Sequence, residues 1–95
     1  MKYELRIQPA ADADVDQAAH YIAQDNLDAA LRFYEAVNDT YARIREHPHR
    51  FARYELDPPR LTDLRMSAVR GFHKFLIFFR IEGEVVEIIR VLHGA

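Results

Sequence analysis

Six side chains able to carry or donate a proton recur along the last third of the chain, where strands are expected: Arg65, Arg70, His73, Lys74, Arg90 and His93. If they converge on one concave basic surface of a sheet, the available chemistry is acid–base cleavage of RNA. Imidazole groups would donate and accept the proton, and guanidinium groups would stabilise the pentavalent phosphate. The endoribonuclease candidates are therefore Arg65, His73, Lys74 and His93. Solvated surface charge is the simpler explanation for any one of them.

The arginines of the same region have a second interpretation, as binding residues without catalysis. The planar guanidinium presents a fork of donors that fits a phosphate or a carboxylate of a partner. The target-binding candidates are Arg65, Arg70, Arg80 and Arg90. A two-residue turn at Glu82-Gly83 would place Arg80 opposite Val85 and diagonal to Glu87, so an Arg80–Glu87 ion pair is the simplest role for Arg80.

Motifs for metal, cofactor or nucleophilic chemistry are missing from the sequence. His47 and His49 flank Pro48 without a third ligand at metal spacing, and there is no cysteine, Gly-rich phosphate loop or serine elbow. Asp12, Asp14 and Asp16 lie near an expected helix N-terminus, where the helix dipole explains them better than catalysis does. We therefore predict no catalytic residue, no metal site and no cofactor.

The composition describes a small globular protein with little net charge. The chain has 95 residues, 49% of them hydrophobic, with 13 Lys and Arg against 15 Asp and Glu and a pI near 6.2. A dedicated nucleic-acid binder usually carries a basic excess, so no sequence-specific nucleic-acid binding is expected. The absence of cysteine favours the cytoplasm, and no export signal or membrane-spanning stretch is recognisable. A single domain covering residues 1–95 is expected.

Hydrophobic periodicity predicts one strand followed by two helices in the first half of the chain. Residues 3–7 alternate polar and apolar side chains, as in a half-buried strand that ends at Pro9. Residues 10–24 repeat apolar side chains at helical spacing. A second helix begins after Asn26, a good N-cap, and ends at His47-Pro48. With so short a link, the two helices should form an antiparallel hairpin.

Three strands are predicted for the second half, at 64–69, 74–81 and 85–92, separated by turns at Arg70-Gly71 and Glu82-Gly83. The apolar run 75–79 indicates a central strand covered on both faces. The expected fold is α+β, with the order β-α-α-β-β-β and a helical hairpin packed on a four-stranded antiparallel sheet. Its other sheet face would stay partly open, where a partner helix or strand can add.

The chain also resembles the RelE/ParE family of small bacterial toxins over nearly its whole length. The resemblance is carried, in order, by Ala29-Ala30 with Phe33, Pro48, Leu61 with Leu64-Arg65, Gly71-Phe72, Ile77-Phe78-Phe79-Arg80 and Ile89-Arg90-Val91-Leu92-His93-Gly94. The resemblance implies a helical hairpin on a four-stranded sheet, in agreement with the periodicity. It also implies a toxin of a type II toxin–antitoxin system, neutralised by an antitoxin whose C-terminal segment wraps around it.

Two branches of that family differ in their targets. Ribosome-dependent mRNA endonucleases of the RelE branch typically carry an Arg early in the third strand, here near Leu76, and further residues beyond the last strand, where this chain stops at Ala95. The ending Arg90-Val91-Leu92-His93-Gly94 is similar to the ParE branch, whose members bind DNA gyrase and stabilise plasmids or chromosomal modules. The resemblance thus favours a gyrase-binding toxin with no chemistry of its own. The alternatives are a ribosome-dependent endoribonuclease and a degenerate toxin that only binds its antitoxin.

The partner expected from the resemblance is a ParD-like antitoxin, in a toxin–antitoxin hetero-oligomer. We expect the antitoxin in the groove between the helical hairpin and the sheet, because bulky aromatic side chains commonly supply most of the binding energy of an interface. The candidates for this role are Tyr21, Phe33, Tyr34, Tyr41, Phe51 and Tyr54. A domain of this size needs most of its aromatic side chains inside, so the majority of these are also candidates for the core.

Overall fold

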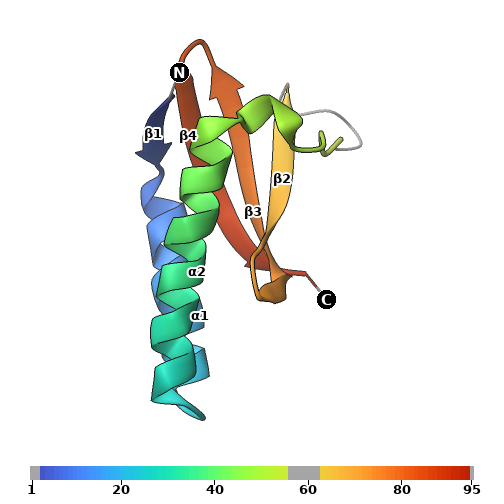
Figure 1. Ribbon diagram of the computed structural model, residues 1–95. Coiled ribbons are helices and arrows are strands. Elements are labelled where there is room, and N and C mark those ends of the chain that lie inside the picture. Colours follow the sequence, from blue (N-terminus) through green and yellow to red (C-terminus); the bar gives the residue numbers. More distant parts are fainter. Residues whose placement is uncertain (1–2, 56–62, 95) are drawn as a thin grey trace.

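The computed structural model describes residues 3–55 and 63–94, in two layers (Figure 1). The elements follow the predicted order and are β1 (Glu4–Ile7), α1 (Pro9–Ala23), α2 (Leu27–Glu46), the short 3-10 helix η1 (Pro48–Arg50), β2 (Leu64–Val69), β3 (Phe72–Glu82) and β4 (Val85–His93). Each predicted element is present, and its bounds agree with the prediction to within two residues. Leu61, which contributes to the family resemblance, lies outside the described residues.

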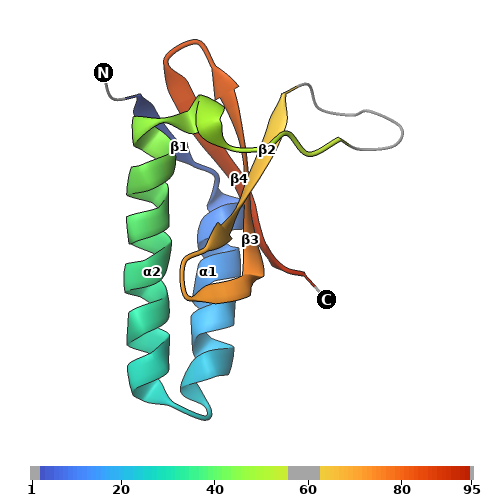
Figure 2. The same ribbon diagram turned by 45° about the vertical axis from the view of Figure 1, so that its right-hand side comes forward.

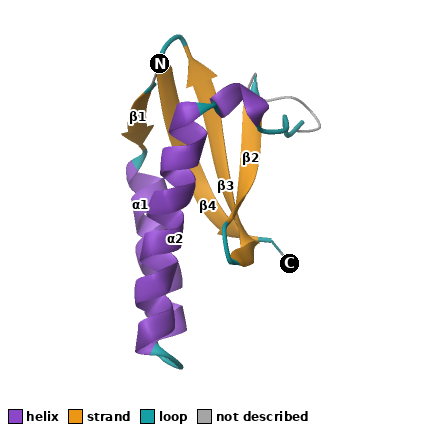
Figure 3. Ribbon diagram, in the orientation of Figure 1, coloured by secondary structure: helices purple, strands orange, loops and turns teal. Residues whose placement is uncertain are grey.

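The four strands form one sheet in the order β1-β4-β3-β2, and Figure 3 shows the two helices on one side of it. β2, β3 and β4 are antiparallel neighbours, but β1 pairs with β4 in parallel. The prediction of a purely antiparallel sheet was therefore wrong. Because the chain reverses direction at every connection after α1, it has reversed four times by β4, which returns it to the direction of β1.

The turn between β3 and β4 differs from the prediction by one residue. It consists of Gly83 and Glu84, and Glu82 pairs with Val85. Gly83 has φ +60, and a two-residue hairpin with glycine at its first central position accommodates that conformation without strain. The shift places Arg80 directly opposite Glu87 and not opposite Val85. The predicted Arg80–Glu87 ion pair is confirmed, at 2.9 Å from Nε to Oε1.

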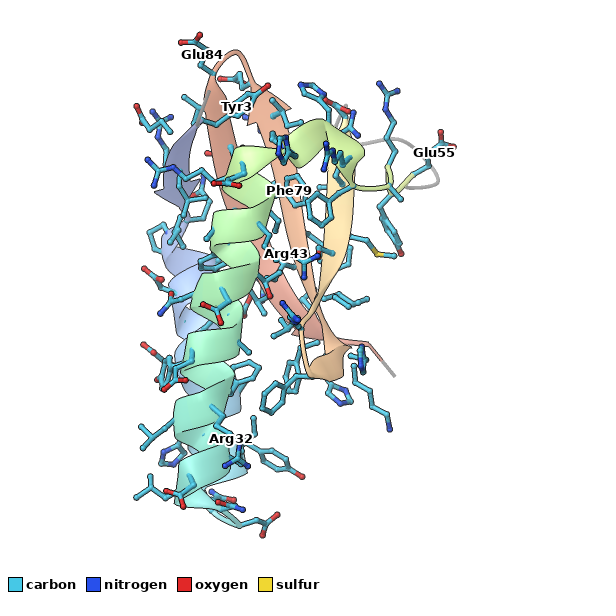
Figure 4. The ribbon with its side chains drawn as sticks, viewed as in Figure 1. Tyr3, Arg32, Arg43, Glu55, Phe79 and Glu84 are labelled. Atoms are coloured by element: carbon cyan, nitrogen blue, oxygen red, sulfur yellow. The ribbon has the colours of Figure 1, made fainter. Side chains whose placement is uncertain are left out.

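β3 is a central strand, as predicted, but only one of its faces is fully covered. Ile77 and Phe79 are completely buried against the helices, and Figure 4 shows Phe79 in the layer between the sheet and α2. On the opposite face Leu76 and Phe78 remain half-buried, with the Tyr54 ring packed edge-on against Phe78 at 5.2 Å. The expectation of cover on both faces was therefore wrong, because both helices lie on the same side of the sheet.

The helical hairpin begins its second helix where the sequence predicted it. The Asn26 side chain accepts a hydrogen bond from the Ala29 N–H at 3.0 Å, which satisfies one free donor of the first turn of α2. Figures 1 and 2 both show the hairpin extending past the end of the sheet. The helix surface near its tip is therefore left without a sheet to cover it, and Leu27 and Leu31 are exposed there.

Candidate functional site

The outer edge of β2 is closed by a short segment of the same chain. Arg53 forms an isolated antiparallel bridge with Arg65, and the Tyr54 N–H donates to the Leu64 carbonyl at 2.7 Å. The Met66 N–H donates to the Ala52 carbonyl at 3.2 Å. The segment 52–54 thus satisfies backbone groups that a bare edge strand would present to other chains.

A buried arginine holds this closing segment. Arg65 is only 7% exposed, and its Nη1 donates to the carbonyls of Phe51 at 2.8 Å and His49 at 3.3 Å. Its Nη2 lies 3.0 Å from Asp63, which Arg53 approaches at 3.3 Å. Asp63 has φ +56, an uncommon conformation for a residue with a side chain. Arg65 is therefore engaged within its own chain, and the structure does not present it to RNA or to a target protein.

The other side of the sheet has a half-open edge where β1 ends. β1 pairs with β4 only as far as Ile88, whose carbonyl accepts the Gln8 N–H, and Pro9 then starts α1. Beyond this point α1 lies along β4 and leaves a groove of about 570 Å³. We call it the α1–β4 groove, and its lining residues are Asp14, Gln17, Ala18, Tyr21, Ile22, Phe75, Arg90, Val91, Leu92 and His93.

A β-bulge decides which side chains of β4 reach the groove. Phe79 pairs with Ile88 but Phe78 pairs with Arg90, so Ile89 is an extra residue in β4. Strict alternation from the buried Ile88 would have turned residue 90 toward the core. With the bulge, Val91 is buried instead and the Arg90 side chain is 46% exposed.

Asp14 of α1 binds Arg90 at the wall of the groove. Arg90 donates from Nε at 2.7 Å and from Nη2 at 2.9 Å to the two carboxylate oxygens, and the Val91 N–H donates to the same carboxylate at 2.9 Å. Asp14 thus satisfies a β4 donor beyond the end of β1. The hydrogen bond from Arg90 holds the pKa of Asp14 below its usual value, and the Val91 N–H adds to this effect against the opposing effect of burial.

The remaining cationic candidates divide between the open sheet face and one end of the sheet. Arg80 is paired with Glu87 and Glu82 on the face away from the helices. Arg70 lies in the β2–β3 turn, and His73 and Lys74 follow at the start of β3. His93 pairs with Phe75, and the Gly94 N–H donates to the Lys74 carbonyl. His73, Lys74 and His93 therefore share one end of the sheet, whereas Arg65 lies toward the other.

The aromatic candidates also separate into core and surface residues. Phe33 and Tyr41 are buried, and the half-buried Phe51 packs edge-on against Phe79 at 5.8 Å, so these three are not free for a partner. The space between hairpin and sheet is filled by the core itself, which supports the core role that the sequence analysis also gave these residues. Tyr21 is 71% exposed and lines the α1–β4 groove. Tyr34 and Tyr54 are partly exposed outside it.

Comparison with known proteins assigns the chain to a family. A family model described as "ParE toxin of type II toxin-antitoxin system, parDE" matches residues 5–95. The chain belongs to the ParE toxin family. Among solved structures, "Chromosomal ParDE TA system from P. aeruginosa" has a similar fold, with a TM-score of 0.78 and 19% identity over 99% of this chain and 98% of that chain. Among curated proteins, no sequence matches this one.

Two features of the groove in this ParE-family chain were not identified by the sequence analysis. They are the contact between Asp14 and Arg90 and the bulge at Ile89. Asp14 was assigned to the helix dipole, yet it lies in the second turn of α1 and binds Arg90 across 76 positions of sequence. Periodicity cannot reveal such a contact, because the bulge at Ile89 sets it. One signal in the sequence was the consecutive apolar pair Ile88-Ile89, which, like Val85-Val86 and Val91-Leu92, departs from the alternation expected of a strand with one covered face.

Within residues 3–55 and 63–94, no group of three or more His, Cys, Asp and Glu side chains is placed to hold a metal ion. Across the same part of the chain, no helix combines the length and apolar character that crossing a bilayer requires.

Proposed function

We propose that this ParE-family chain is a cytoplasmic toxin that inhibits DNA gyrase by binding to it and is neutralised by a cognate antitoxin. The observation that carries the proposal is the α1–β4 groove, a partly apolar hollow bordered by a half-open strand edge. Grooves of this kind accept an amphipathic helix or an extended peptide segment. The family match supports a toxin of a type II system, and the groove supplies a place for the protein that restrains it.

The distribution of the endoribonuclease candidates supports binding over RNA cleavage. Arg65 is engaged with Asp63 and with two backbone carbonyls, so it has little freedom to meet a phosphate. Arg65 pairs with Phe79, and Lys74 lies five residues away along β3, a separation of about 16 Å at the usual rise of a strand. Acid–base catalysis needs its groups within hydrogen-bond reach of one scissile bond. His73, Lys74 and His93 would have to act without Arg65.

Tyr21 is the aromatic candidate best placed for the antitoxin. It projects from α1 beside the exposed Leu92 of β4, with Ile22 and Phe75 also lining the groove. Aromatic side chains at the centre of an apolar hollow often supply a large share of interface energy. The antitoxin was predicted to bind between hairpin and sheet, and we assign it more specifically to the α1–β4 groove.

Arg70 is the target-binding candidate least restrained by the fold. Its side chain is exposed in the β2–β3 turn, and no ion pair involves it among the described residues, whereas Arg65, Arg80 and Arg90 are each paired with an acid of the same chain. Exposed and unpaired cations can meet an acidic protein surface without first breaking an internal contact. We assign Arg70 to the gyrase-facing surface.

Supercoiling of relaxed plasmid by purified gyrase tests the proposed target. We expect the protein to inhibit supercoiling and to accumulate cleaved linear DNA, and we expect stoichiometric antitoxin to reverse both effects. Arg70→Ala should weaken inhibition while leaving antitoxin affinity unchanged. Arg50→Ala, at an exposed position of η1 near the opposite end of β2, is the matched control and should inhibit like the parent protein.

Full gyrase activity at saturating toxin would overturn the gyrase assignment. The same protein would then be added to translating ribosomes, where cleaved mRNA would favour the endoribonuclease alternative through His73, Lys74 and His93. Antitoxin binding without growth arrest, gyrase inhibition or mRNA cleavage would indicate a degenerate toxin.

A further inference from the structure

We propose that Arg90, fixed in place by Asp14, binds a carboxylate of the antitoxin segment that occupies the α1–β4 groove. The inference rests on the proposed neutralisation by an antitoxin and adds the chemistry of recognition. The proposed antitoxin segment is acidic and amphipathic, with an apolar side chain on the groove floor and an Asp or Glu at the groove rim. From the sequence alone, Arg90 was predicted only as one of four candidates for binding the target.

The geometry of Arg90 leaves donors available for such a partner. A guanidinium has five N–H groups, and the two nitrogens that bind Asp14 are Nε and Nη2. No hydrogen bond from Nη1 occurs among the described residues, and the side chain remains 46% exposed where it lines the groove. One guanidinium can therefore bind Asp14 along one side and a second carboxylate along another.

Asp14 makes this arrangement rigid before any partner arrives. Its carboxylate is held by the Val91 N–H as well as by Arg90, and its own side chain is only 11% exposed. Ordering a long side chain at an interface costs conformational entropy, and a side chain already fixed in its bound position avoids most of that cost. Asp14 is thus a positioning residue, and Arg90 is the residue in contact with the partner.

The hydrogen-bond donors around the groove favour an anionic partner. His93 lines the groove together with Arg90, and Lys74 lies beside its end through the Gly94–Lys74 backbone hydrogen bond. Asp14 is the one acidic side chain among the lining residues, and Arg90 engages it. A basic segment would meet like charge at the rim, whereas an acidic one would find unsatisfied donors next to an apolar floor.

Calorimetric titration with the purified full-length antitoxin encoded beside the toxin gene tests the inference. Arg90→Ala should raise the Kd by at least about tenfold, the loss expected when a charge-assisted contact is removed from an interface. Arg80→Ala is the matched control, because Arg80 is equally paired with a carboxylate but lies outside the groove, and its Kd should stay within about twofold of the parent value.

A second variant separates direct contact from an indirect effect of Asp14. In Arg90→Ala alone, the unpaired Asp14 carboxylate would itself repel an acidic partner. The double variant Asp14→Ala/Arg90→Ala removes that carboxylate, and we expect its affinity to remain weak. Asp14→Ala alone should raise the Kd severalfold, because Arg90 keeps its charge but loses its fixed position. Raising the salt concentration should weaken binding of the parent protein more than binding of Arg90→Ala.

Parent-like affinity in Arg90→Ala, or recovery of parent affinity in the double variant, would overturn the role of Arg90 and leave the proposed neutralisation intact. No binding of the antitoxin by the parent protein would overturn both. A toxin dimer seen by sedimentation and lost in Arg90→Ala would also overturn the inference, because it would assign the groove to a second copy of the chain.

Discussion

The two sides of the sheet use the same pair of residue types for different purposes. At β2, Arg65 binds Asp63 in the interior and holds a segment of the same chain along the strand edge. At β4, Arg90 binds Asp14 at the surface, where β1 has ended and α1 leaves a groove. One ion pair closes an edge and the other borders an opening. The exposure of the side chain, 8% for Arg65 and 46% for Arg90, decides which of the two arginines can meet a partner.

The closed edge gives the largest expected effect. Arg65→Met keeps most of the apolar stem but leaves Asp63 and the Phe51 carbonyl without their main donor. We expect a loss of about 3 kcal/mol in the free energy of unfolding, measured by urea denaturation. Arg70→Met, five residues along the chain and exposed, is the control and should change stability by less than about 0.5 kcal/mol. A loss below about 1 kcal/mol for Arg65→Met would show that the segment 52–54 does not depend on it.

The half-open edge should be less sensitive. Asp14→Ala removes the acceptor of the buried Val91 N–H and of Arg90, and the exposure of Arg90 lets solvent replace part of its contact. We expect a loss of about 1–2 kcal/mol by the same urea titration. Asp16→Ala is the comparison and should cost less, because Asp16, two residues further along α1, accepts an exposed hydrogen bond from the Tyr34 hydroxyl. Equal losses in the two variants would mean that Asp14 contributes no more than a surface hydrogen bond.

The difference between the two edges also shows which features of the fold and of the groove could be predicted from the sequence. Among the described residues, periodicity located both α-helices and the four strands, because each has one apolar face or a turn residue such as Asn26 or Gly71 at its end, but it did not predict η1. It misassigned β1, since strand direction depends on how many times the chain has reversed. It treated Arg65 and Arg90 alike, although burial separates them. The Asp14–Arg90 contact was missed, because a one-residue bulge in β4 turns that side chain outward.

Two carboxyl groups make the fold less stable as the pH becomes acidic. The pKa of Asp14 is lowered from 3.8 by its hydrogen bond with Arg90, and that of Glu87 is lowered from 4.5 by its hydrogen bond with Arg80. Because the folded state favours both charged forms, their stabilisation is present above these ordinary values and is lost as pH falls through the lowered ones. Unfolding followed by circular dichroism should show stability falling as the pH drops below about 4.5.

The variant Asp14→Asn measures how much of this loss of stability at acidic pH comes from Asp14 in the groove. It should be less stable than the parent protein at neutral pH and lose less on acidification, so that the two unfolding free energies converge as the pH falls through the lowered pKa of Asp14. Glu87→Gln tests the open sheet face in the same way. If the difference between parent and Asp14→Asn stayed constant from neutral to acidic pH, the charge of Asp14 would not be the source of its contribution.

The smallest effect is expected for Tyr41→Phe. This variant tests whether burial alone explains why losing Arg65 lowers the free energy of unfolding. Tyr41 is buried between the helices, and its hydroxyl has no hydrogen-bond partner among the described residues. Burial, with the nearby charges of Asp12 and Asp14, raises the pKa of Tyr41 to about 12, so the group stays neutral. Tyr41→Phe removes an unsatisfied polar atom and should leave stability unchanged or raise it by up to about 1 kcal/mol. A loss above about 1 kcal/mol would reveal a hidden partner for the hydroxyl. A neutral result would show that a buried polar group matters in this fold through the contacts it makes, which Arg65 has and Tyr41 lacks.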